Sequence, residues 1–174
     1  LLRHGEPQGG RKYRGQSDDP LNERGWQQMW SAVGEDRPWR HILTSPLSRC
    51  QAFAAALSRE MGVPAAEDKR LMEIGFGVWE GHTVDEIRAF DEQTLFAFWQ
   101  DPEHNRPEGA ETLTGFADRV SAAFNEHAGH PEHSPLLMVA HAGVIRRVIA
   151  EVLGMELHNM YRLQIPYAGM VRLR

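Results

Sequence analysis

Two short segments that lie far apart in the chain share one pattern of residue types. Each is an apolar run that leads into a histidine and then into small residues: residues 1–5 end in Arg3-His4-Gly5, and residues 137–143 end in His141-Ala142-Gly143. Ligands of open α/β sheets bind just beyond the carboxyl ends of the strands. We therefore expect His4 and His141 to meet at one edge of a sheet, where the small residues let a ligand approach the backbone.

The same edge is expected to carry positive charge. Arg3 adjoins His4, and Arg49 falls in the first turn of a helix that follows an apolar strand at residues 41–44. Guanidinium forks suit phosphate or carboxylate groups, and the helix that begins after His141 offers free N–H groups to an anion. A single histidine or arginine of this kind is more often structural, but the four residues together predict an oxyanion site.

The elements that must position these residues follow an alternation of short apolar runs and longer helical patterns. This alternation is typical of an α/β fold. Strands or extended segments are expected at the start of the chain and at residues 41–44, 65–72 and 136–139, and helices at 22–34, 46–61, 112–127 and 144–153. We expect a three-layer α/β/α sandwich with a mostly parallel central sheet, formed by a single domain over residues 1–174.

Two segments at the periphery complete this expectation. Residues 160–164 and 169–173 are expected to form two final strands, which give the sheet an antiparallel edge strand and permit a homodimer. Residues 83–112 begin with a capping-box pattern and are rich in Phe, Trp, Asp and Pro, so they are a candidate flap over the site. The aromatic residues of this flap are more typical of a core, but any that face the ligand would favour an organic phosphate with an apolar or ring component.

Composition limits the classes of function. The 174 residues include 41% hydrophobic and 25% charged residues, as in a globular protein. The net charge of −5 argues against nucleic acid or an anionic membrane as a partner. Cys50 is the only cysteine, so no intrachain disulfide is expected and a reducing cytoplasm is the expected compartment. No signal peptide is visible, and because the chain opens within a motif we expect a few residues to precede Leu1.

Several segments together resemble the histidine phosphatase superfamily, which includes the cofactor-dependent phosphoglycerate mutases. The resemblance covers most of the chain, and the motifs occur in the family's order. They are Arg3-His4-Gly5-Glu6, the loop and helix start at residues 15–25, the second arginine motif at 44–49, the acid-bearing segment at 71–81 and the second-histidine motif at 139–146. A lone Arg-His-Gly is common by chance, whereas this ordered set is specific.

The resemblance implies a metal-independent phosphomonoester hydrolase that needs no cofactor. His4 would attack phosphorus as a neutral nucleophile while its other ring nitrogen donates to a backbone carbonyl. Arg3, Arg49, a protonated His141 and the backbone of Ala142 would surround the phosphoryl group and offset its charge. Gly15 and Gln16 would contact the substrate, which is expected to be a small phosphorylated metabolite.

The resemblance also implies that Glu73 is the acid. Glu73 would protonate the leaving alkoxide and then deprotonate the water that hydrolyses phosphohistidine. This role requires a raised pKa, which the nearby apolar residues Ile74, Phe76 and Trp79 are expected to supply by partial desolvation. Glu80 is the competing candidate, but it matches a flanking structural position of the family.

Two other functions stay open beside the hydrolase. Within the superfamily the chain looks most like the alpha-ribazole-5′-phosphate phosphatases of cobalamin assembly, on its compact length, its run at residues 76–80 and its loop at 13–21. One alternative is a phosphoglycerate mutase-type phosphotransferase, although such mutases are usually longer. The other is a non-catalytic phospho-ligand-binding regulator on the same fold. Pro7, and the lack of an Asn after the first motif, depart from the family pattern and leave open whether that loop contacts phosphate.

Three further features have two interpretations each. Cys50 is either a nucleophile or, as its helical spacing favours, a packed core residue. The spacing of His127, His130 and His133 permits a metal site, although the neighbouring prolines favour a solvated loop. The loop at residues 9–14 is rich in glycine and basic residues, so it is either a phosphate-binding loop or a flexible turn near the mouth of the site.

Overall fold

The computed structural model describes residues 1–174 and contains one sheet of four parallel strands in the order β1-β4-β2-β3. The strands are β1 (Leu2–Arg3), β2 (His41–Thr44), β3 (Ala65–Glu67) and β4 (Leu136–Ala140). Because β1 and β4 are neighbours, the strand that leads into His141 lies beside the strand that leads into His4. The two histidine segments therefore meet at the carboxyl edge of the sheet.

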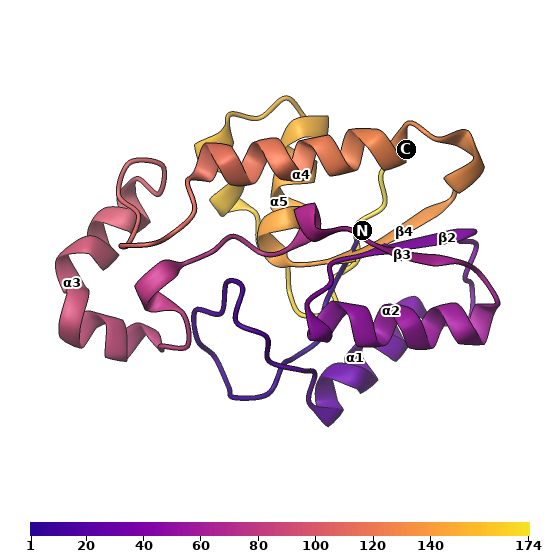
Figure 1. Cartoon of the computed structure of the whole chain (residues 1–174), viewed down its shortest axis with the longest axis horizontal. Coiled ribbons are helices and arrows are strands. Elements are labelled where there is room, and N and C mark those ends of the chain that lie inside the picture. The colour runs from indigo at the N-terminus through magenta and orange to yellow at the C-terminus, as the bar shows by residue number, and fades with distance from the viewer.

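Helices cover both faces of this sheet (Figure 1). Helices α1 (Glu23–Val33) and α2 (Ser48–Met61) lie on one face, and α4 (Leu113–Ala128) and α5 (Ala142–Val152) lie on the other. Alternate residues of β4 point to opposite faces. Leu137 and Val139 accordingly pack with α1 and α2, whereas Met138 and Ala140 pack with α4 and α5. The predicted three-layer sandwich around a parallel sheet is confirmed.

Side-chain caps fix the starts of the helices. The Asn22 side chain accepts a hydrogen bond from Gly25 N at 2.7 Å at the start of α1, and Thr112 caps α4 in the same way. Helix α2 begins at Ser48 rather than at Pro46. Helix α5 begins at Ala142, directly after His141 and two residues earlier than its apolar pattern predicts. His141 therefore stands at the junction of β4 and α5.

The predicted antiparallel edge strand is not formed. Residues 157–162 form a 3-10 helix, in which Leu157 and Met160 pack together against the core at the three-residue spacing of that helix. The last segment makes only an isolated antiparallel bridge, between Met170 and Leu2. Pro166 has no N–H to donate and Ala168 has a φ of 52°, so the chain before this bridge cannot follow a strand.

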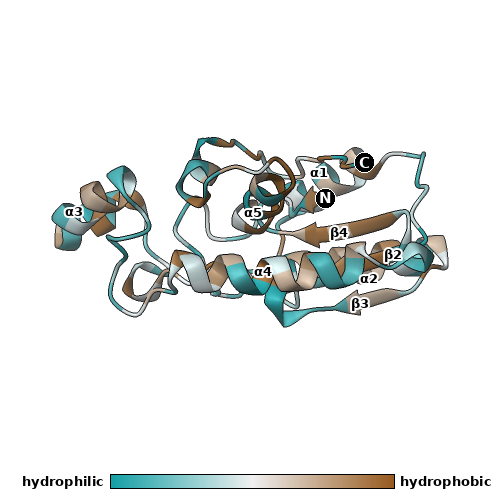
Figure 2. Cartoon of the chain, turned by 90° about the horizontal axis from the view of Figure 1, so that it is seen from above, coloured by the Kyte–Doolittle hydropathy of each residue, from teal (hydrophilic) through white to brown (hydrophobic).

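The segment that follows the acid-bearing stretch is more regular than expected. Helix α3 (Val84–Gln100) extends beyond the end of the sheet, apart from the other helices, and carries both apolar and polar residues along its length (Figures 1 and 2). It is kinked at Asp91, whose carboxylate accepts a hydrogen bond from Trp79 Nε1 at 2.9 Å. None of the helices combines the length and the apolar character that crossing a membrane requires.

Candidate active site

A cavity of about 770 Å³ opens at the carboxyl edge of the sheet. Its lining comes from the end of β1, the loop at residues 10–15, the start of α2, the segment after η1 (Lys69–Leu71), the start of α5 and the C-terminal segment. Six of the eight site residues predicted from the sequence line it, namely Arg3, His4, Gly15, Arg49, Glu73 and Ala142. His141 and Gln16 lie outside the lining.

His4 is held with one ring nitrogen toward the protein. Its Nδ1 lies 2.7 Å from the carbonyl oxygen of Gly5, and because a carbonyl only accepts, Nδ1 carries the proton. Burial and the charges of Arg49 and Arg3 hold the pKa of His4 well below its usual range. The ring is therefore neutral near pH 7, with its lone pair on Nε2, which is the state that a nucleophile requires.

His141 packs behind His4 rather than on the cavity wall. The two ring centroids are 5.2 Å apart, and the His141 Nε2 atom lies 2.8 Å from Ser45 Oγ. Burial and the charges of Arg49 and Arg3 hold the pKa of His141 well below its usual range. The expectation of a protonated His141 therefore differs from the structure, whose buried and cationic surroundings favour the neutral ring.

Arg3 at the end of β1 and Arg49 in the first turn of α2 both line the cavity. Arg49 donates to the carbonyl oxygens of Ser17 at 2.7 Å and Gly15 at 2.8 Å, and Arg3 donates to the carbonyl oxygen of Ile165 at 2.6 Å. The Nε atom of each arginine has no hydrogen-bond partner. Neither guanidinium is paired with a carboxylate, so their positive charge is available to an anion in the cavity.

Glu73 faces the start of α5. Its carboxylate accepts hydrogen bonds from Gly143 N at 3.2 Å and from Ile74 N at 3.1 Å. A Cβ atom on Gly143 would lie 2.3 Å from Glu73 Oε1, so glycine is required for this close approach. The second-histidine motif thus carries the donor that orients the Glu73 carboxylate.

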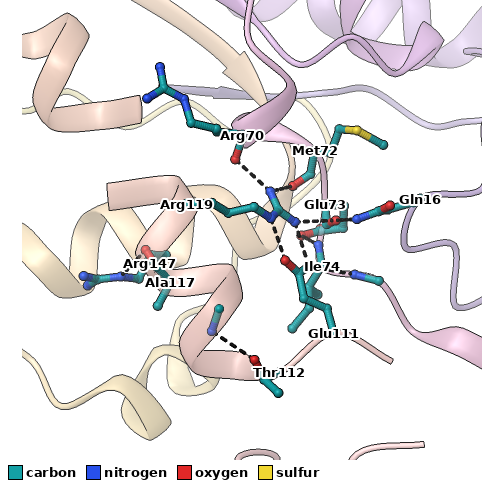
Figure 3. A network of polar contacts seen from close by, with 12 residues as sticks. Gln16, Arg70, Met72, Glu73, Ile74, Glu111, Thr112, Ala117, Arg119 and Arg147 are labelled. Carbon is teal, nitrogen blue, oxygen red and sulfur yellow. Dashed lines mark hydrogen bonds and ion pairs between the residues drawn. The ribbon is translucent and has the colours of Figure 1, made fainter. Parts of the chain in front are cut away.

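Arg119 on α4 fixes the backbone on which Glu73 sits (Figure 3). Its guanidinium donates to the carbonyl oxygens of Arg70 and Met72, both at 2.7 Å, and of Glu73 at 3.1 Å. It also forms a two-point ion pair with Glu111 at 2.6 and 2.7 Å. The amide of Gln16 reaches the same Glu73 carbonyl at 3.4 Å. Sequence reasoning missed Arg119, because nothing near it in the chain signals contacts with residues 70–73.

Glu80, the competing candidate for the acid, binds the backbone of neighbouring loops instead of facing α5. Its carboxylate accepts hydrogen bonds from the backbone N–H groups of Gln16, Ser17 and Phe76 and from the hydroxyl of Ser17, at 2.9 to 3.0 Å. Gly15 has a φ of 51°, and a Cβ atom there would lie 2.1 Å from Glu80 Oε1. Glu80 therefore links two segments: the loop at residues 15–17, whose carbonyl oxygens accept from Arg49, and the segment at residues 71–81.

The loop at residues 9–14 forms part of the cavity wall. Arg14 is buried and donates to the carbonyl oxygens of Gln8 and Gly10 and to Asp19, while Lys12 pairs with Asp19 at 2.9 Å. These bonds hold the basic residues of the loop beside the cavity. The lining also includes residues that the sequence did not single out for a role, among them Tyr13, Arg146, Tyr161 and Tyr167.

Two other candidates from the sequence, Cys50 and the histidine cluster at residues 127–133, lie in surroundings that favour a structural role. Cys50 is fully buried, and burial raises the pKa of its thiol well above the usual range, so the thiol stays protonated and is a poor nucleophile. His133 lies among His41, His127 and His130, with ring centroids 4.6 to 6.1 Å apart. No group of three or more His, Cys, Asp or Glu side chains is arranged to hold a metal ion.

An α/β sandwich that gathers a neutral histidine, two unpaired arginines and a carboxylate at one sheet edge defines an enzyme of phosphate-ester chemistry, either a phosphatase or a mutase. The chain belongs to the histidine phosphatase superfamily (branch 1), whose family model matches residues 1–174.

Proteins similar to this chain include some named as phosphoglycerate mutases and others named as phosphatases. The chain is 30% identical over 182 residues to a Yersinia pestis protein named as a probable phosphoglycerate mutase, GpmB, with 99% of this chain and 82% of that protein covered. An Erwinia tasmaniensis protein of the same name is 29% identical over 178 residues, with the same coverage. The solved alpha-ribazole phosphatase of Shigella flexneri has a TM-score of 0.86 at 27% identity, covering 97% of this chain and 85% of that one. A mycobacterial glucosyl-3-phosphoglycerate phosphatase has a TM-score of 0.83 at 29% identity, covering 96% and 84%.

Proposed function

We propose that this protein hydrolyses a small organic phosphomonoester through a phosphohistidine on His4. The observation that carries the proposal is the state of His4, a neutral ring with Nδ1 bound to the Gly5 carbonyl, between two arginines that lack carboxylate partners. A neutral imidazole nitrogen held beside fixed positive charge is suited to attack on phosphorus. The arginines stabilise the equatorial oxygens in the transition state.

In the first step, Nε2 of His4 bonds to phosphorus while the bond from phosphorus to the ester oxygen breaks. Glu73 gives its proton to the leaving alkoxide. The N–H group of Ala142 at the start of α5 and the two arginines hold the phosphoryl oxygens. The negative charge of the phosphate raises the proton affinity of His141 behind His4, so that a protonated His141 would offset this charge only while phosphate is bound.

In the second step, Glu73 takes a proton from water, and the water oxygen attacks phosphorus. The bond between phosphorus and Nε2 breaks, which releases inorganic phosphate and restores neutral His4. Each cycle thus consumes one ester and one water and leaves Glu73 protonated again. Arg119, Glu111 and the Gly143 N–H group hold the Glu73 segment in place through both steps.

The preferred substrate is alpha-ribazole 5′-phosphate, which would place the enzyme in cobalamin biosynthesis. The likeness to the Shigella flexneri alpha-ribazole phosphatase supports this choice. The second candidate is a phosphoglycerate mutase, which the names of the Yersinia and Erwinia relatives favour. A mutase would return the phosphoryl group from His4 to a sugar acid instead of to water. We further propose a cytoplasmic enzyme that acts without a metal, a nucleic-acid partner or a membrane.

The test is a parallel assay with EDTA present. The protein is incubated with p-nitrophenyl phosphate, alpha-ribazole 5′-phosphate and 3-phosphoglycerate, and both inorganic phosphate and 2-phosphoglycerate are measured. Phosphate release that vanadate inhibits, without conversion of 3- to 2-phosphoglycerate, is the expected result. Interconversion of the phosphoglycerates would establish the mutase instead, and loss of all turnover with EDTA would contradict the metal-independent mechanism.

A further inference from the structure

We infer that a second cavity beside the phosphate site holds the leaving group of the substrate, and that this leaving group carries a planar ring. This inference rests on the proposed hydrolysis and specifies its substrate class. The second cavity has a volume of about 910 Å³ and lies between the C-terminal part of α3, the turn after it and η4 (Leu157–Arg162). Its size falls within the range of small-molecule sites.

The two cavities are adjacent and share four wall residues, which we call the partition. Tyr13, Phe76, Arg146 and Tyr161 line both of them. A substrate whose phosphate lies at His4 therefore meets this partition as it extends away from the phosphate. Arg146 is held by a hydrogen bond from its Nε to the Leu163 carbonyl oxygen at 2.8 Å, which fixes the position of its guanidinium.

Aromatic rings form this partition and continue into the second cavity. Tyr13 meets Phe76 with ring centroids 5.0 Å apart, Phe76 meets Phe98 at 6.1 Å, and Phe98 meets Tyr161 at 6.1 Å, all edge to face. Rings in this arrangement leave faces and edges on which a further ring stacks. Phe98 and Trp99 belong to the second cavity alone, so they mark the end where the ring would lie.

One polar atom in the partition lacks a partner. The hydroxyl group of Tyr161 is buried and makes no hydrogen bond. Such a group is costly to bury unless something satisfies it. Burial also raises the pKa of Tyr161 above its usual range, so the hydroxyl remains a proton donor at all physiological pH values. An oxygen or ring nitrogen of the leaving group would satisfy it.

The test compares two substrates that differ only by the ring. Alpha-ribazole 5′-phosphate and ribose 5-phosphate present the same phosphorylated sugar, and adenosine 5′-monophosphate supplies a second ring. We expect kcat/KM to be at least about tenfold higher with either ring than with ribose 5-phosphate. Phe98→Leu, which keeps an apolar side chain, should reduce this ratio several-fold. Phe90→Leu is the matched control, since Phe90 lies on the same helix, is 53% exposed and lines neither cavity.

The outcomes separate this inference from the proposed function. Hydrolysis of all three phosphates with equal kcat/KM would leave the phosphatase intact and overturn the ring site. An equal fall in the ratio for Phe98→Leu and Phe90→Leu would also overturn it, because the effect would then not come from the cavity. A protein that hydrolyses none of the three would contradict both. Tyr161→Phe gives an independent check: it should raise KM for the ring-bearing substrates, with circular dichroism verifying that the variant folds.

Discussion

The sheet edge and helix α3 hold their chemically interesting side chains in opposite ways. At the edge, His4, Arg49 and His141 are charged or polar residues that are no more than 5% exposed. Backbone carbonyl groups fix His4 and Arg49, and the Ser45 hydroxyl lies against the His141 ring. On α3, the ring of Trp99 lines the second cavity and is 47% exposed. The edge is therefore preorganised for one reaction, whereas α3 is an adaptable surface that selects what reacts.

This contrast predicts that substitutions at the edge change the rate of the chemical step, and that substitutions on α3 change substrate choice. The edge is anchored by the parallel register of β1, β4 and β2. Helix α3 is joined to the loop of the edge by a bond from Trp99 Nε1 to the Tyr13 hydroxyl at 3.1 Å.

Arg49→Met should lower kcat/KM for p-nitrophenyl phosphate by about 10²- to 10³-fold, because it removes a fixed positive charge from the transferring phosphoryl group. Arg49→Lys should recover only part of this loss, since a lysine ammonium lacks the planar guanidinium that donates to the carbonyl oxygens of both Ser17 and Gly15. Steady-state kinetics measure the effect. The control is Arg59→Met on the same helix, at an exposed position, which should behave as wild type. Equal losses in the two methionine variants would contradict the assignment.

Arg119→Lys should lower kcat by about 10- to 100-fold, because the Glu73 backbone loses its anchor and a small misplacement of a catalytic group is costly. The loss should be larger for an alkyl phosphate than for p-nitrophenyl phosphate, whose leaving group needs no proton. Glu73→Gln should show the same dependence on the leaving group. The control Arg147→Gln removes a contact with α4 that does not involve residues 70–73. An Arg119→Lys variant that slows both esters equally would assign this residue a general structural role.

The buried histidines should make folding stability depend on pH. The folded-state pKa values of His4 and His141 lie below the unfolded value near 6.5, so the unfolded chain binds more protons at acidic pH. Stability is fully present above about pH 6.5 and falls below it, by at most about 1.4 kcal/mol per pH unit for each histidine. Urea unfolding between pH 7.5 and pH 5 measures this slope. His4→Asn should reduce the slope, and an unchanged slope would show that other groups cause it.

Trp99→Leu should have the smallest effect of the four. It breaks the bond to Tyr13, and a hydrogen bond of about 1 kcal/mol corresponds to roughly a fivefold rise in KM for a ring-bearing phosphate. The expected change in kcat is less than twofold. Phe90→Leu, at an exposed position of the same helix that lines neither cavity, is the control and should leave KM unchanged. A fall in kcat without a change in KM would contradict the division of roles between α3 and the edge.

The parts of the site that the sequence predicted are those that local pattern determines. His4 and His141 directly follow apolar strands, and Arg49 follows a strand and a turn, so the rule for ligands at strand ends places all three together. The cores on the two faces of β4 likewise follow from its continuous apolar run, because alternate residues of a strand point to opposite faces. The state of His141 was less predictable, because its pKa depends on neighbours that come from other parts of the chain.

The parts that could not be predicted depend on contacts between distant segments. Arg119 reads as an ordinary charge on an amphipathic helix, and only the fold brings it to the carbonyl groups at residues 70–73. Residues 160–164 were expected to form a strand, but Met160 packs against the core within a 3-10 helix. The kink of α3 at Asp91 could not be predicted either, because no glycine or proline lies at that position. At the kink, the Asp91 carboxylate accepts a hydrogen bond from Trp79 Nε1.

The central claim is that His4 carries the phosphoryl group during the reaction. The most direct test is to quench the enzyme during turnover of a radiolabelled phosphomonoester and to locate the label by peptide mapping. We expect a phosphoenzyme that is labile in acid and stable in base, with the label on His4, and no label or turnover in His4→Ala. Label on another residue, or an active His4→Ala variant, would contradict it.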